Sequence, residues 1–362
     1  MTQAPASKTP VTVLTGYLGA GKTTLLNRIL SEDHGKRYAV IVNEFGEIGI
    51  DNDLIVGADE EVFEMNNGCV CCTVRGDLIR VLSGLMKRKG GFDAIIVETT
   101  GLADPGPVAQ TFFVDEDVKA RTQLDSVTTV VDAKHVLLRL SDSREAREQI
   151  AFADQIVLNK TDLVSEQDLR MVEARLRRLN PLAPIHRAQR SNVPLDAILG
   201  RGGFDLERIV SIEPEFLNPA HGEAGHVHDE HCDHDHGHDH GHDHHQGHDH
   251  GHGHDHAKAS DIHDDDIRGI SLRLDRPVDG GKITTWLNDL LAAQGPDILR
   301  AKGIIDVAGD ERRLVFQAVH MILEGDFQRP WNATDQRHSR LVFIGRDLDE
   351  AKLRAGFEAC AA

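Results

Sequence analysis

A glycine-rich turn near the N-terminus constrains the fold of this chain more than any other feature. Residues 16–23 read GYLGAGKT and fit the pattern G-x-x-x-x-G-K-[ST]. They follow the apolar run Val11–Leu14 and precede a helical pattern that begins near Thr24. Glycines let backbone N–H groups face inward, and a helix N-terminus adds positive potential. The segment therefore predicts a phosphate site, and a chance glycine-rich turn would lack this strand–turn–helix context.

The same pattern assigns roles to the residues of this turn. Lys22 can reach the β- and γ-phosphates of a nucleotide, and Thr23 offers a hydroxyl to Mg²⁺. The predicted nucleotide-binding residues of the turn are Gly16, Gly19, Gly21, Lys22, Thr23 and Thr24. The phosphate site is thus predicted to hold a nucleoside triphosphate with its magnesium ion.

Short apolar runs alternate with helical patterns through the first 210 residues. The runs predict buried strands at Val11–Leu14, Tyr38–Val42, Ile95–Val97, Val127–Val131 and Gln155–Leu158. Helical spacing appears in 25–30, in 78–85 and from Glu166 to Leu179. This alternation predicts an α/β domain of the P-loop NTPase class, with a mostly parallel sheet covered by helices on both faces.

Residues 221–256 interrupt every pattern, because they consist mainly of His, Asp and Gly. Such a segment lacks the apolar side chains that would offset the entropy of ordering, so we expect a disordered linker. Strand and helix patterns resume at Ile267 and predict a smaller α/β domain. The predicted division is a P-loop domain at 1–210, a linker at 211–266 and a C-terminal domain at 267–362.

The charge of the chain argues against nucleic-acid binding. The net charge is −19, and residues 221–266 hold thirteen acidic residues and one lysine, so no general basic surface is expected. No apolar run approaches the ~20 residues of a membrane span, and the polar N-terminus does not resemble a secretory signal. We therefore expect a soluble cytoplasmic protein with no membrane partner.

A second short motif, Asn159-Lys160-Thr161-Asp162, follows the strand Gln155–Leu158. Asp162 would accept hydrogen bonds from guanine N1 and N2, a pair of donors that adenine lacks, so the motif favours GTP over ATP. Asn159 would bind the base edge or tie this loop to the phosphate loop, and the Lys160 stem would lie along the base. Alternatively, Asp162 is a solvated acid before a helix capped by Ser165.

Two further loops are expected to face the γ-phosphate. The strand Ile95–Val97 ends in Glu98, which can hold Mg²⁺ through water or orient the attacking water, and the N–H of Gly101 can sense the γ-phosphate. Residues 43–51, which include Glu44 and Glu47, occupy the place of a first switch, although their carboxylates could simply be solvated. Hydrolysis would then depend on electrostatics and on the positioning of water.

A cysteine cluster predicts a metal site. Cys69, Cys71 and Cys72 lie between the strand Val62–Met65 and a helix expected near Asp77, and three thiols so close together can converge on Zn²⁺, Co²⁺ or Cu⁺. Glu44, Glu47 or His135 could supply a fourth ligand. Buried structural cysteines and a redox dithiol are the alternatives. Because the cluster lies between the first switch and Glu98, a bound metal could respond to nucleotide state.

The histidine-rich segment predicts a second, weaker kind of metal binding. Residues 221–263 hold seventeen of the 22 histidines, and neutral imidazoles bind Zn, Cu, Ni and Co. The segment would buffer metal as an accessory to the cysteine site. A spacer without a role, or a cloning tag, is the alternative, although the segment is internal and irregular.

Together these motifs resemble those of the CobW-like GTPases, a family of metal-handling P-loop proteins. The matching segments are GYLGAGKTT (16–24), NEFGEIGID (43–51), NNGCVCCTVRGDL (66–78), IIVETTGLADP (95–105), VVDAKH (130–135) and NKTDL (159–163), followed in the C-terminal domain by IRGISLRLDRP (267–277), ILRAKGI (298–304) and RLVFIGRDL (340–348). The resemblance covers essentially all of the chain outside the N-terminal tail and the linker.

The resemblance implies a GTP-dependent metallochaperone that hydrolyses GTP and delivers Zn²⁺ or Co²⁺ to a client metalloprotein. On that reading at least two of Cys69, Cys71 and Cys72 are ligands, and the C-terminal domain docks clients. Related P-loop proteins often dimerise across the nucleotide, so a homodimer is possible. The competing hypotheses are a passive histidine-rich metal buffer with an uncoupled GTPase domain, and a P-loop kinase or ligase, against which Asp162 argues.

Overall fold

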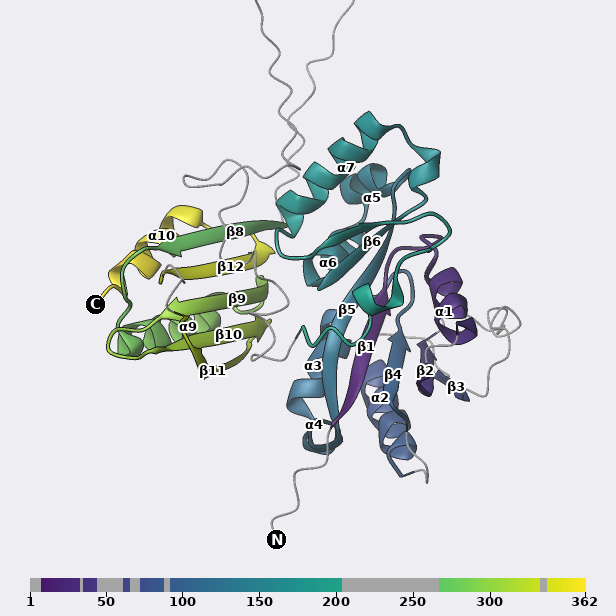
Figure 1. Cartoon of the computed structure of the whole chain (residues 1–362), viewed down its shortest axis with the longest axis horizontal. Helices are drawn as coiled ribbons and strands as arrows, with labels where there is room; N and C mark the ends of the chain where they lie inside the picture. Colours follow the sequence, from purple (N-terminus) through teal and green to yellow (C-terminus); the bar gives the residue numbers. More distant parts are fainter. Residues whose placement is uncertain are drawn as a thin grey trace, which may run out of the picture.

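The computed structural model describes residues 8–32, 35–43, 61–65, 72–87, 92–203, 267–332 and 337–362. These residues form two sheets with helices packed on them (Figure 1). The predicted linker at 211–266 lies outside the described residues, as do Glu44, Glu47, Cys69 and Cys71.

The first sheet has seven strands in the order β3-β2-β4-β1-β5-β6-β7, and all neighbouring pairs are parallel. The strands are β1 (Thr9–Thr15), β2 (Tyr38–Asn43), β3 (Glu61–Met65), β4 (Ala94–Glu98), β5 (Thr122–Asp132), β6 (Gln155–Asn159) and β7 (Ile185–Arg187). Every residue of β4 and β6 is buried, as expected for parallel strands covered on both faces. The predicted parallel sheet is confirmed.

Helices cover both faces of this sheet. The helices are α1 (Lys22–Ser31), α2 (Cys72–Leu85), α3 (Gly106–Val114), α4 (Glu116–Arg121), α5 (Val136–Asp142), α6 (Arg144–Phe152) and α7 (Glu166–Leu179). Leu25 and Ile29 of α1 share a core with Leu14 on one face, whereas Val13 belongs to the core formed with α2, α3 and α5 to α7 on the other. Adjacent residues of β1 thus enter opposite cores, because side chains alternate across a strand.

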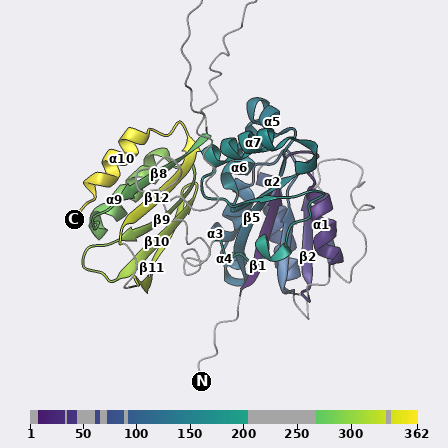
Figure 2. The same ribbon diagram turned by 45° about the horizontal axis from the view of Figure 1, so that its top comes forward.

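The second sheet is antiparallel, with five strands in the order β11-β10-β9-β12-β8. Its strands are β8 (Ile267–Leu274), β9 (Ile298–Asp306), β10 (Arg312–Val319), β11 (Ile322–Pro330) and β12 (Ser339–Arg346), and its helices are α9 (Gly280–Gln294) and α10 (Glu350–Ala359). Figures 1 and 2 show α9 and α10 on the side of this sheet that faces away from the first domain. The predicted smaller C-terminal domain with strands and helices is confirmed.

Both faces of the second sheet are buried. Leu341 and Phe343 of β12 pack in the core with α9 and α10. Val342 and Ile344 of the same strand belong instead to the core of the first domain. One continuous apolar core therefore spans the two domains and fixes how the second sheet packs on the first domain. Helix α6 contacts β8 and β9 of the second sheet and β5 of the first (Figures 1 and 2).

The structure departs from the sequence patterns at a few elements. Helix α2 begins at Cys72 and not near Asp77, so the last cysteine of the cluster opens the helix. Strand β9 was not predicted, because Arg300 and Lys302 interrupt its apolar run. Both side chains are nevertheless buried, at 2% and 1% exposure. Their partner lies in the other domain, and no local pattern could reveal it.

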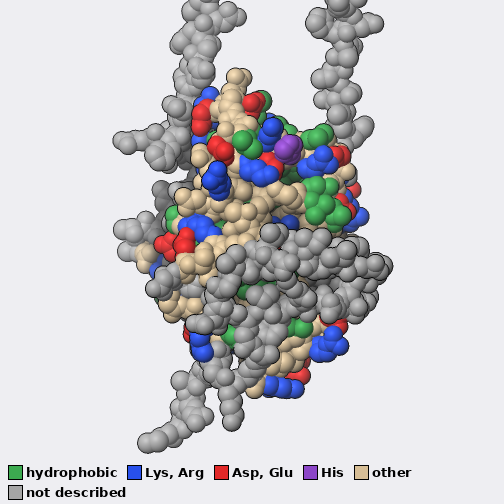
Figure 3. Space-filling model, turned by 90° about the vertical axis from the view of Figure 1, so that its right-hand side faces the viewer, with side chains coloured by type: hydrophobic (Ala, Val, Ile, Leu, Met, Phe, Trp, Pro, Cys, Tyr) green, Lys and Arg blue, Asp and Glu red, His purple; other side chains and the backbone are tan. Residues whose placement is uncertain are grey.

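Among the described residues, no helix combines the length and apolar character needed to cross a bilayer. Figure 3 shows the side of the molecule that carries α1 and the β3 edge of the first sheet. On the described part of this side, Lys and Arg side chains are interspersed with Asp and Glu side chains. A face of this kind has no broad positive region of the sort that grips a nucleic-acid backbone.

Candidate nucleotide site and metal motif

The predicted phosphate loop connects β1 to α1 and has the shape that an anion requires. Gly16 and Gly21 have φ angles of +142° and +112°, which favour glycine. A Cβ atom at Gly16 would lie 2.2 Å from the carbonyl oxygen of Val130, and one at Gly21 would lie 2.5 Å from Nδ2 of Asn159. Both glycines are therefore required where the loop packs against its neighbours.

The N-terminus of α1 is open to an anion. Gly21 occupies the N-cap and has no side chain to cap the helix, and the first turn carries no acidic residue. The first N–H groups of a helix have no partner within it, so they are donors for a phosphate. The Nζ atom of Lys22 donates to the Gly16 carbonyl at 2.8 Å, so the lysine side chain lies back along the loop.

Glu98 and Gly101, which the sequence predicts to serve hydrolysis, lie beside the phosphate loop. Glu98 ends β4, is 7% exposed, and pairs in register with Leu14 of β1. The hydroxyl of Thr99 donates to that of Thr15 at 2.8 Å, which joins the ends of the two strands. We call residues 99–105 the γ-phosphate loop, because the sequence predicts that they face the γ-phosphate. At Gly101 a Cβ atom would lie 2.7 Å from the Leu18 nitrogen, so this loop packs directly on the phosphate loop.

Asn159 ties the predicted base-selecting loop to the phosphate loop, which is one of the two roles that the sequence left open. Its Nδ2 atom donates to the Ala20 carbonyl at 2.9 Å, and its Oδ1 atom accepts from the Ser191 backbone N–H at 2.8 Å. The Ser191 hydroxyl donates to the Gly21 carbonyl at 3.0 Å. Ser191 was not found from the sequence, because it follows the three-residue strand β7, which has no clear pattern of its own.

Lys160 extends from the same loop across the phosphate loop. It has a φ angle of 61°, and its Nζ atom donates to the Gly19 carbonyl at 2.8 Å and to Oδ2 of Asp132 at 2.7 Å. Asp162 is exposed in a single 3-10 turn (Thr161–Leu163), and Ser165 caps α7 as expected. Lys160 lines the larger cavity described below, and the role of Asp162 in selecting the base stays a prediction.

Asp132 is a site residue that the sequence analysis missed. It ends β5, next to the phosphate loop, and its carboxylate accepts from both Lys160 and Nδ1 of His135, the latter at 3.0 Å. Burial alone would raise the pKa of Asp132, but the hydrogen bonds from Lys160 and His135 outweigh it and lower that pKa. The rule that ligands bind at the carboxyl ends of parallel strands could have identified this residue.

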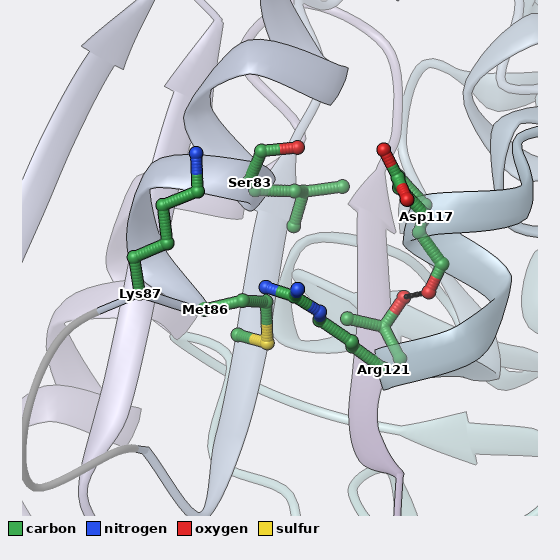
Figure 4. Close-up of a pocket in the computed structure, with 8 residues that line it drawn as sticks. Ser83, Met86, Lys87, Asp117 and Arg121 are labelled. Carbon is green, nitrogen blue, oxygen red and sulfur yellow. Dashed lines mark hydrogen bonds between the residues drawn. The ribbon is translucent and has the colours of Figure 1, made fainter.

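Two cavities of different size lie on the first domain. The larger has a volume of about 360 Å³ and lies between the phosphate loop, the end of β5, α5, α6 and Lys160. Small-molecule sites usually start at about 300 Å³. The smaller, of about 60 Å³, lies between α2 and α4 and is lined by Ser83, Met86, Lys87, Asp117 and Arg121 (Figure 4). Of these two cavities, the larger adjoins Gly19 and Lys160 of the predicted nucleotide residues.

The metal prediction falls largely outside the described residues. Glu44, Glu47, Cys69 and Cys71 are not described, and of Cys72 only its place at the start of α2 is known. Within the described residues no cluster of three or more His, Cys, Asp or Glu side chains could hold a metal ion. The metal site therefore stays a prediction.

The strand order bears on the fourth ligand. Strand β3, which leads into the cysteine segment, lies four strand spacings from β5, which leads to His135. Four spacings amount to about 19 Å. Strand β2, which leads to Glu44 and Glu47, is the direct neighbour of β3. The topology thus favours Glu44 or Glu47 over His135 as the partner of the three cysteines.

Comparison with known families shows two matches. The model described as "CobW/HypB/UreG, nucleotide-binding domain" matches residues 10–187. The model described as "Cobalamin synthesis protein cobW C-terminal domain" matches residues 267–361.

Relatives and solved structures agree with the family matches. The chain is 35% identical to the zinc chaperone YjiA of Escherichia coli, over 96% of this chain and 97% of that protein. It is 46% identical to the zinc-regulated GTPase metalloprotein activator 1 of Schizosaccharomyces pombe, over 49% and 44% of the two chains. The crystal structure of Zn(II)-bound YjiA GTPase superposes with a TM-score of 0.72 and 31% identity, covering 98% of this chain and 100% of that one.

Proposed function

Because the chain belongs to the CobW family of P-loop GTPases, we propose that it is a metallochaperone that hydrolyses GTP to deliver Zn²⁺ to a client metalloprotein. In this proposal the zinc ion is cargo. Cys69, Cys71 and Cys72 hold it together with Glu44 or Glu47, and the nucleotide state of the neighbouring loops sets how tightly it is held.

One observation carries the proposed coupling. Strands β2, β3 and β4 end at the same level, because Asn43 pairs with Met65 and Val42 pairs with Glu98. The chain that leaves β2 toward Glu44 and the chain that leaves β3 toward the cysteines therefore start within about 10 Å of Glu98, that is, within two strand spacings. A metal held there would share loops with the γ-phosphate.

The residues of the phosphate site fit Mg²⁺ as the resident ion. Thr23, in the first turn of α1, and Glu98, which is largely buried at the end of β4, offer the oxygen ligands that Mg²⁺ prefers. Bound there with the nucleotide, the ion would neutralise charge on the phosphates. Lys22 would exchange the Gly16 carbonyl for phosphate oxygens, and Glu98 would orient the attacking water.

The proposal includes assembly with a partner. Leu18, Leu102 and Leu138 are 60%, 54% and 55% exposed, and they lie on the phosphate loop, the γ-phosphate loop and α5. Exposed leucines at a nucleotide edge support a contact surface there, for a second copy of the chain or for the client. Sedimentation with a GTP analogue and with GDP tests the homodimer, which should form preferentially in one nucleotide state.

Zinc affinity measured in the two nucleotide states tests the function. We expect the zinc Kd to differ by about 5- to 150-fold between the GTP-analogue and GDP forms, because coupling between two sites typically amounts to about 1–3 kcal/mol. Cys71→Ala should remove the difference. Cys360→Ala is the matched control, because that free thiol is buried in the C-terminal domain.

Deletion of 221–263 separates delivery from passive buffering. On our proposal the deletion lowers the number of weak zinc sites and leaves the difference between nucleotide states intact. If zinc affinity is the same in both states, and the deletion abolishes tight binding, the chain is a histidine-rich buffer with an uncoupled GTPase domain.

A further inference from the structure

The γ-phosphate loop receives a hydrogen-bonding partner from α6. Gln149 is 1% exposed, and its Nε2 atom donates to the carbonyl oxygens of Gly101 and Ala103, each at 3.1 Å. The backbone of Gln149 is fixed in turn, because its carbonyl accepts the Thr129 hydroxyl of β5 at 2.8 Å. One buried amide group therefore holds the segment whose Gly101 packs on the phosphate loop.

The residue before Gln149 on the same helix faces the other domain. The carboxylate of Glu148 accepts a hydrogen bond from Arg346, at the end of β12, and from Nε of Arg144 at 2.7 Å. Arg346 is itself fixed, because its Nη1 atom donates to the Pro296 carbonyl at 3.2 Å. Two neighbouring side chains of α6 thus bind the γ-phosphate loop and the C-terminal domain.

The end of the γ-phosphate loop also meets the C-terminal domain. The His320 ring lies 5.2 Å from the Phe152 ring of α6, and its Nε2 atom is 2.8 Å from where a Cβ atom at Gly106 would lie. Asp104, inside the loop, accepts from the Gly106 N–H at 2.8 Å. Burial raises the pKa of Asp104, and the charge of Glu148 adds to this rise, which indicates how close the loop lies to the Glu148–Arg346 pair.

The C-terminal end of α6 is anchored as well. Arg300 of β9 donates to the Phe152 carbonyl at 2.6 Å and forms a fully buried ion pair with Asp154. Lys302 lies 3.3 Å from the same carboxylate. Because α6 is bound by the C-terminal domain at two points, a shift of that domain would move α6 and the Gln149 amide with it.

We infer that Gln149 is a positioning residue for GTP hydrolysis, and that through α6 the C-terminal domain sets the position of the γ-phosphate loop. Docking of a partner on the C-terminal domain would then alter the hydrolysis rate without contacting the nucleotide. The inference rests on GTP hydrolysis and not on zinc delivery, so assays with Mg²⁺ and without zinc test it independently of the proposed function.

Gln149→Leu tests the first part, because it keeps the volume and removes both donors. We expect kcat to fall about tenfold or more, as for a small misplacement of a reacting group. Affinity for a non-hydrolysable GTP analogue should fall, whereas GDP affinity should stay within twofold, since only the γ-phosphate faces this loop. Gln155→Leu is the matched control: Gln155 is also buried, and it pairs with His186 at 2.8 Å away from the loop. This control should leave kcat and the affinity ratio unchanged.

Gln149→Glu adds a readout that a purely structural role would not produce. Its carboxylate would face two carbonyl oxygens at neutral pH, and its protonated form could donate one hydrogen bond again. The kcat of this variant relative to wild type should therefore rise as the pH falls. The neighbouring ionisable groups Glu148, Asp104 and His320 are present in both proteins, so their contribution cancels in this ratio. An unchanged kcat in Gln149→Leu, or equal losses of GTP-analogue and GDP affinity, would overturn the assignment.

Arg346→Ala tests the link to the C-terminal domain. We expect a decrease in kcat of about threefold, and no further loss when Arg346→Ala is added to Gln149→Leu, because both act through the same contact. Arg273→Ala, which removes an exposed pair with Asp275 on the same domain, serves as the control and should have no effect. Losses that multiply in the double variant would show that Arg346 does not act through Gln149.

Discussion

The nucleotide edge of the first sheet and the interface between the domains both concentrate charge, but they use it differently. At the nucleotide edge, Lys22 and Lys160 donate to backbone carbonyls of the phosphate loop and lie within reach of a ligand. At the interface, Arg300 and Lys302 are 2% and 1% exposed and meet the carboxylate of Asp154.

The charged side chains of the nucleotide edge are available to a ligand, whereas those of the interface stabilise the fold. The two lysines of the nucleotide edge come from short motifs, and in our proposal Lys22 exchanges its carbonyl partner for phosphate oxygens. The interface charges come from segments about 150 residues apart, and removing either side would leave a buried charge without its opposite charge in the pair Asp154–Arg300. Substitutions at the edge should therefore change activity, and substitutions at the interface should change stability.

Asp154→Asn should give the largest effect on stability. It leaves Arg300 and Lys302 buried without their counter-charge, so we expect the free energy of unfolding to fall by about 3–5 kcal/mol in urea titrations at neutral pH. Glu350→Ala, at an exposed pair with Arg354, should change it by less than about 1 kcal/mol. A similar loss of unfolding free energy in Asp154→Asn and Glu350→Ala would contradict the stabilising role given to the interface charges.

The same ion pair predicts a pH dependence. Burial would raise the pKa of Asp154, but Arg300 and Lys302 outweigh it and lower that pKa below 3.8. Its stabilising contribution is therefore present above about pH 4 and is lost as the pH falls through the lowered pKa. Stability should fall more steeply below pH 4 in wild type than in Asp154→Asn.

Lys22→Ala should give the largest effect on activity. Removing a charge aimed at the transferring phosphate typically costs about 10²- to 10³-fold in kcat. Because Lys22 makes its contacts within the phosphate loop, thermal stability should change little. Lys352→Ala on the exposed side of α10 is the control and should change neither property. If Lys22→Ala loses thermal stability together with kcat, Lys22 stabilises the fold and is not kept for a ligand.

Asp162→Asn should lower GTP affinity by about a hundredfold, because a site built for guanine N1–H and N2–H loses its acceptor. The asparagine amide can donate to the C2 carbonyl of xanthine, so affinity for xanthosine triphosphate should rise. Competition between the two nucleotides measures both changes. If Asp162→Asn binds GTP as tightly as the wild-type protein does, the exposed Asp162 is a solvated turn residue.

Ser191→Ala should have the smallest effect. It removes the hydroxyl that donates to the Gly21 carbonyl and accepts from Nδ2 of Asn159 at 3.2 Å, and it leaves the bond from the Ser191 backbone N–H to Oδ1 of Asn159. A loss of about 1 kcal/mol in nucleotide binding, or roughly fivefold in Kd, is expected because these hydrogen bonds hold the loops and not the ligand. Isothermal titration with GDP would measure it, and a change above fiftyfold would show that Ser191 contacts the nucleotide.

The sequence by itself determined the phosphate loop, the strands that flank it and the parallel sheet. These features depend on neighbours in the chain: glycines where φ is positive, apolar runs at strand spacing, and Ser165 at the start of α7. It also identified the C-terminal domain, because the alternation at Ile270, Leu272 and Leu274 needs no distant partner. The cysteine segment was found from spacing alone, and its geometry lies outside the described residues.

Which distant groups meet depends on the packing of the two domains. Strand β9 carries two buried cations that meet the carboxylate of Asp154 from the other domain, and the Gln149 amide reaches the γ-phosphate loop because α6 folds against it. Local patterns report backbone preference and amphipathic faces, whereas the partner of a buried charge or amide depends on packing between segments far apart in the chain.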